Sequence, residues 1–127
     1  MKKQKTILVV EDEKDLREMV VEMLHQKNYL TLEAGNGKEG VNLALSKRPD
    51  LILLDILMPV MEGMTALKII RANTWGAHVP VIIMTNLSAT DEHMVEDMVT
   101  RKPMYYLIKS DWMISDVIKK IEELIKN

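Results

Sequence analysis

The chain has 127 residues, of which 47% are hydrophobic and 28% charged, with a formal net charge of -2 and no cysteine. This length suits one domain, and the lack of cysteine excludes disulfides, thiolate metal sites and cysteine nucleophiles. The small, mixed charge argues against nucleic-acid binding, and no apolar run is long enough to cross a bilayer. We therefore expect one domain over residues 1–127, in a reducing cytoplasm, with no direct contact to nucleic acid or membrane.

Short apolar runs alternate with amphipathic segments along the whole chain. The first segment, between two apolar runs, repeats apolar residues at helical spacing, so it predicts a helix that buries Leu16, Met19, Val20, Met23 and Leu24. Asn36 and Gly37 are typical of the start of a second helix, Gly63 precedes a third, and Ser88 or Thr90 is a plausible cap of a fourth. A fifth helix is predicted from the periodic apolar residues between Ile114 and Ile125.

The apolar runs themselves predict five strands, over Thr6–Val10, Tyr29–Glu33, Leu51–Leu54, Val81–Met84 and Tyr105–Ile108. Nearly continuous apolar strands that alternate with helices indicate a parallel sheet covered on both faces. We therefore predict an α/β fold of the doubly wound, flavodoxin-like kind, with five parallel strands in the order 2-1-3-4-5 and five helices.

Chemically interesting side chains follow the predicted strands. Glu11 and Asp12 follow the first, Asp55 the third, Thr85 the fourth and Lys109 the fifth. The carboxyl ends of parallel strands share one edge of the sheet, and ligands of such folds bind there. The sequence thus predicts three carboxylates, a hydroxyl and an ammonium group in one shallow pocket.

Three neighbouring carboxylates cannot all ionise near neutral pH unless a cation shares them, and an all-oxygen set suits Mg²⁺. Thr85 and Lys109 would then be available for the oxygens of an anion, as in phosphoryl-transfer sites. Asp55 would be the nucleophile and form an acyl phosphate. Each residue alone is more often a helix cap or a solvated charge, so the prediction depends on their combination.

The acidic pair Glu11-Asp12, the D-x-x-M-P-x-x-x-G pattern of Asp55 to Gly63, PVIIMT ending at Thr85 and YLIK ending at Lys109 occur in this order. With these motifs the whole chain resembles the response-regulator receiver domain of two-component signalling.

The resemblance implies that Asp55 accepts a phosphoryl group from a histidine kinase or phosphotransfer protein. It implies that Glu11, Asp12, Asp55 and the main-chain carbonyl of Leu57 hold Mg²⁺. Thr85 and Lys109 would bind the phosphoryl oxygens, and Tyr106 would be the aromatic switch residue. The downstream protein partner would bind the face of helix four, strand five and helix five, with the chain a monomer or a phosphorylation-dependent dimer.

The chain departs from the family pattern before strand five, where Arg101, Lys102 and Pro103 replace the usual small residues, and at two positions of the site. Ser110 follows the lysine where receivers usually have proline, and Asn86 follows the threonine where a small residue is usual. The positions two after Asp55 and two after Thr85 are Leu57 and Leu87, which cannot activate water, so we expect slow self-dephosphorylation and no enzymatic turnover.

Two other functions remain open at this point. A receiver-like interaction module that works without phosphorylation would accommodate Ser110 and Asn86. An aspartate-nucleophile phosphatase of the haloacid-dehalogenase type is disfavoured, because that chemistry needs a second aspartate where this chain has Leu57.

Overall fold

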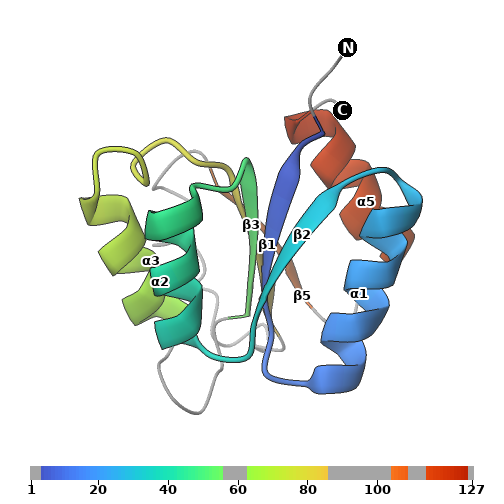
Figure 1. Cartoon of the computed structure of the whole chain (residues 1–127), viewed down its shortest axis with the longest axis horizontal. Helices are drawn as coiled ribbons and strands as arrows, with labels where there is room; N and C mark the ends of the chain where they lie inside the picture. Colours follow the sequence, from blue (N-terminus) through green and yellow to red (C-terminus); the bar gives the residue numbers. More distant parts are fainter. Residues whose placement is uncertain (1–3, 56–62, 86–103, 109–113, 126–127) are drawn as a thin grey trace.

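The computed structural model describes residues 4–55, 63–85, 104–108 and 114–125. These residues form a five-stranded parallel sheet with helices on both faces (Figure 1). The strands are β1 (Thr6–Val10), β2 (Leu30–Ala34), β3 (Leu51–Asp55), β4 (Val81–Thr85) and β5 (Met104–Ile108). The described helices are α1 (Lys14–Gln26), α2 (Gly37–Lys47), α3 (Gly63–Ala72) and α5 (Ile114–Leu124). The fourth predicted helix falls on residues outside the described ranges.

The sheet has the order β2-β1-β3-β4-β5, which confirms the predicted doubly wound topology. Helices α2 and α3 cover one face and helices α1 and α5 the other (Figure 1). Neighbouring residues of each strand belong to opposite layers: Leu8 and Val10 pack under α2 and α3, whereas Ile7 and Val9 pack under α1 and α5. Because both layers are apolar, the central strands carry the continuous apolar runs seen in the sequence.

Helix α2 begins where the sequence predicts. The Asn36 side chain accepts a hydrogen bond from the backbone N–H of Glu39 at 2.9 Å, and the Glu39 carboxylate accepts one from the N–H of Gly35 at 3.0 Å. The first bond satisfies a donor that a helix start leaves open, and the second ties the Glu39 side chain to the backbone just before the cap.

Three strands are each one residue longer than predicted: β3 includes Asp55, β4 includes Thr85, and β5 begins at Met104.

Two further details differ from the predictions. Strand β2 begins at Leu30 and not at Tyr29, because the backbone N–H of Tyr29 bonds to the carbonyl of Leu24 while its ring is buried in the layer under α1 and α5. Met19 was predicted to be buried but is 47% exposed, whereas Val21 is buried. Helix α1 is therefore rotated slightly relative to the face that its periodicity indicated.

No helix among the described residues is both long enough and apolar enough to span a membrane.

Candidate functional site

The carboxyl ends of β1, β3 and β4 bring most of the predicted site residues to one edge of the sheet. Val10 pairs with Leu54 in the register of β1 and β3, so Glu11 and Asp55 each come one residue after this pair. Asp55 pairs with Met84, and Thr85 is the next residue and the last of β4. Neighbouring strands lie about 4.8 Å apart, so the backbones of these residues are close together.

The fifth strand extends the same edge. Thr85 pairs with Ile108, the residue before Lys109, and Ile83 pairs with Tyr106. Tyr106 therefore lies in β5, beside β4. Leu57, Asn86, Lys109 and Ser110 lie outside the described residues. The structure describes the backbone of Asp55, Thr85 and Tyr106.

The two acids after β1 differ in their surroundings. Glu11 is a fully buried charged residue in the described core, whereas Asp12 is exposed. The backbone N–H of Glu11 donates to the carbonyl of Ala34 at 3.0 Å, and its carboxylate oxygen Oε2 accepts from the N–H of Glu13 at 3.2 Å. Glu11 is thus held in the sheet, while Asp12 lies at the surface of the same turn.

A buried carboxylate needs compensation, since taking an ionised acid out of water costs several kcal/mol or more. Glu11 and Asp12 place carboxylate oxygens at the sheet edge, and such oxygens could hold a hard divalent cation. Within the described ranges no group of three or more His, Cys, Asp or Glu side chains could hold a metal. The two acids offer oxygen ligands only, and Mg²⁺ prefers oxygen to nitrogen or sulfur ligands.

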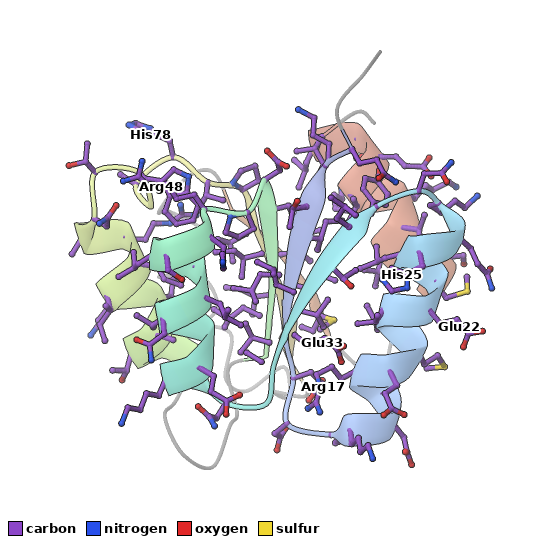
Figure 2. The ribbon with its side chains drawn as sticks, viewed as in Figure 1. Arg17, Glu22, His25, Glu33, Arg48 and His78 are labelled. Atoms are coloured by element: carbon purple, nitrogen blue, oxygen red, sulfur yellow. The ribbon has the colours of Figure 1, made fainter. Side chains whose placement is uncertain are left out.

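Arg17 contacts the acidic turn, although nothing in the sequence analysis singled it out. Its Nη1 donates to the carbonyl oxygen of Glu11 at 2.7 Å, and its Nε lies 3.4 Å from Oε1 of Glu33. Figure 2 shows Arg17 and Glu33 together at this end of the sheet, whereas Arg48 and His78 lie at the opposite end. The sequence did contain one signal for this contact. Arg17 lies near the start of a helix, and a cation at the positive N-terminal end of a helix is unfavourable without a specific partner.

The comparisons with known proteins agree with this geometry. A family model described as the response regulator receiver domain matches residues 7–122. The transcriptional regulatory protein PdtaR of Mycobacterium tuberculosis is 36% identical over 117 residues, which cover 91% of this chain and 54% of that protein. The sporulation initiation phosphotransferase F of Bacillus subtilis is 35% identical over 85 residues, 67% of each chain. This chain thus spans about half the length of PdtaR.

Among solved structures, the receiver domain of the sensor histidine kinase PA1611 from Pseudomonas aeruginosa superposes with a TM-score of 0.84 at 26% identity. The match covers 98% of this chain and 100% of that domain. That structure is described with a magnesium ion coordinated in its active-site cleft.

Proposed function

Because this chain belongs to the response regulator receiver family of two-component signalling, we propose that it is a signalling domain switched by phosphorylation of Asp55. The observation that supports this most directly is the strand register, which puts Glu11 beside Asp55 and Asp55 beside the residues that end β4. The buried Glu11 carboxylate adds support, because it lies at the same edge and carries oxygens of the kind that bind a divalent cation. We propose that the receiver domain takes up all of residues 1–127.

In the proposed reaction, a carboxylate oxygen of Asp55 attacks the phosphorus of a phosphohistidine on a histidine kinase or phosphotransfer protein. A P–O bond forms, the P–N bond breaks, and the leaving imidazole takes a proton from solvent. Glu11, Asp12, Asp55 and the Leu57 carbonyl would hold Mg²⁺, which neutralises charge on the phosphoryl oxygens when bound. Lys109 would pair with those oxygens, and the Thr85 hydroxyl would donate to one of them.

The output would follow from the new charge. A phosphoryl group adds about -1.5 to -2 charge at pH 7, which draws Thr85 and Lys109 toward Asp55. Tyr106, in the strand beside β4, would respond to this shift. The downstream protein would then bind the face of helix four, β5 and α5, with the chain either a monomer or a phosphorylation-dependent dimer.

We propose storage of the phosphoryl group and not catalytic turnover. Leu57 and Leu87, two residues after Asp55 and Thr85, would flank the phosphoryl group, and neither can orient or activate a water molecule. The aspartyl phosphate should therefore persist for minutes or longer in a cytoplasmic setting, and a lifetime of seconds would contradict this part of the proposal.

The test is intact-mass measurement after incubation with a small-molecule phosphodonor and Mg²⁺. We expect the wild type to gain one phosphoryl group and Asp55→Asn to gain none, with both proteins folded by circular dichroism. Omitting Mg²⁺, or replacing Asp12 by alanine, should suppress the gain. A folded wild type that gains no phosphoryl group in saturating Mg²⁺ would refute the proposal and favour an interaction module that works without phosphorylation.

A further inference from the structure

Arg17 joins three parts of the fold at the edge that carries the proposed site. It comes from the first turns of α1, bonds to the carbonyl oxygen of Glu11 after β1, and pairs with Glu33 of the edge strand β2. Its side chain is only 19% exposed, although it carries a full charge. Its partly buried guanidinium is restrained by the hydrogen bond to the Glu11 carbonyl and the ion pair with Glu33, in contrast to a solvated surface arginine.

The contacts of Arg17 fix the peptide that links the two acids. The Glu11 carbonyl belongs to the peptide bond between Glu11 and Asp12, and Nη1 of Arg17 holds this oxygen at 2.7 Å. On the other side of the residue, the N–H of Glu11 is held by the carbonyl of Ala34. With both backbone groups of Glu11 engaged, the peptide planes on its two sides are held, and with them the direction in which the Glu11 side chain leaves the main chain and the peptide from which Asp12 follows.

Arg17 also lies beside Gly35, the residue that follows β2. A Cβ atom at Gly35 would lie 3.4 Å from Nη1 of Arg17, so the guanidinium passes close over the backbone where β2 ends. Glu33 approaches the same guanidinium at its Nε atom. The arginine therefore spans the gap between the end of β2 and the acidic turn.

We propose that Arg17 is a positioning residue for Mg²⁺ binding: it holds the Glu11-Asp12 peptide in the orientation that presents both carboxylates to the ion. This inference rests on the proposed function, because it concerns the same metal site. Residues that orient metal ligands typically change metal affinity by about 10–100-fold when they are removed.

The charge of Arg17 alone predicts the opposite effect. A cationic side chain near a bound cation repels it, so removing the charge without any loss of order would tighten Mg²⁺ binding. The sign of the change in affinity therefore separates positioning from simple electrostatics. A purely structural role for Arg17 would lower stability and leave the Mg²⁺ affinity of the folded protein unchanged.

The experiment is calorimetric titration of the full chain with Mg²⁺, for the wild type, Arg17→Met and Arg17→Lys. The matched control is Lys14→Met, which removes the same charge from the first turn of α1 at a side chain that is 74% exposed and paired only loosely, at 3.9 Å, with Glu18. We expect about tenfold weaker binding for Arg17→Met and an intermediate loss for Arg17→Lys, whose single ammonium keeps the charge but lacks the fork. Lys14→Met should bind as the wild type does.

Phosphorylation kinetics give a second readout. The Mg²⁺ concentration for half-maximal phosphorylation should rise about tenfold in Arg17→Met, while the rate at saturating Mg²⁺ stays within about twofold of the wild type. Unchanged or tighter Mg²⁺ binding by folded Arg17→Met would overturn the inference. If Arg17→Met does not fold, Arg17→Lys decides by the same criteria, and wild-type affinity in that variant would count against positioning.

The outcomes also distinguish this inference from the proposed function. A wild type that binds no Mg²⁺ overturns both. A wild type that binds Mg²⁺ and is phosphorylated, with Arg17→Met behaving identically, overturns the positioning role alone.

Discussion

Replacing Gly76 by alanine should destabilise the protein strongly without touching the proposed site. Gly76 is buried in the loop between α3 and β4. A Cβ atom there would overlap the carbonyl oxygen of Ile70 and lie 2.8 Å from its carbonyl carbon and 2.9 Å from its Cγ2. Backbone atoms of a helix cannot yield as the end of a flexible side chain can, so residue 76 must move instead.

The movement would disturb the hydrogen bonds that hold the loop. Nη1 of Arg71 donates to the carbonyl oxygens of Gly76 at 2.8 Å and Val79 at 2.7 Å. Burial lowers the pKa of the Arg71 guanidinium, so a lost acceptor leaves a poorly hydrated charge behind. Asn73 also accepts from the N–H of Trp75 at 2.9 Å, and this bond belongs to the same turn.

The magnitude follows from these terms. Overpacking costs about 1–3 kcal/mol, and loss of one hydrogen bond from a charged donor adds about 1.5–3 kcal/mol. Alanine also lowers the conformational entropy of the unfolded chain relative to glycine, which stabilises the folded protein by about 0.4–1 kcal/mol. We therefore expect Gly76→Ala to lower the free energy of unfolding by about 3 kcal/mol, which corresponds to a fall in Tm on the order of 10 °C.

Urea unfolding followed by far-ultraviolet circular dichroism measures this change. The matched control is Gly35→Ala, because a Cβ at Gly35 meets only flexible side-chain ends, at 3.4 Å from Arg17 and 3.9 Å from Glu39. The control should stay within about 1 kcal/mol of the wild type. If Gly76→Ala were equally close to the wild type, the rigidity assigned to the loop would be wrong. At low temperature, folded Gly76→Ala should still accept a phosphoryl group, since the loop lies at the amino ends of the strands.

Two further changes test local features of the fold. Asn36→Ala removes the side-chain cap of α2 and should cost about 1 kcal/mol in urea unfolding, whereas Asn36→Asp, which keeps an acceptor oxygen, should cost much less; equal losses would argue against capping. Tyr29→Phe tests pH dependence: burial and then the nearby Glu122 carboxylate raise the pKa of Tyr29 above its ordinary value of 10.0. As the pH rises, the hydroxyl of Tyr29 therefore loses its proton in the unfolded chain before it does so in the folded protein. The contribution of Tyr29 to the free energy of unfolding is fully present below pH 10 and falls above it. The fall should be shallower in Tyr29→Phe, and identical pH profiles would contradict the assignment.

Much of the site's architecture was predictable because strand ends are local features of the sequence. The apolar runs that stop at Val10, Leu54 and Met84 indicate the strand ends to within one residue, and in a parallel sheet all such ends meet at one edge. The predicted strand order is confirmed, and so is the start of α2 at the Asn36 cap. The roles of Asp55, Thr85 and Lys109 stay predictions that the phosphorylation experiment addresses.

Other features depend on contacts between residues that are distant in the chain. Periodicity shows that α1 has an apolar face, but packing against the sheet and α5 sets its rotation, which exposes Met19 and buries Val21. Tyr29 is likewise packed in the core layer under α1 and α5, and β2 begins only at the next residue, Leu30.

What the sequence by itself determined is the alternation of strands and helices and the set of polar groups that follow the strands, because both arise from neighbouring residues. Only the tertiary structure decided that Glu11 is buried while the adjacent Asp12 is exposed, and that Arg17 reaches both Glu11 and Glu33. The physical reason is that burial and ion pairing depend on what the rest of the chain brings to a residue, and no local pattern contains that information.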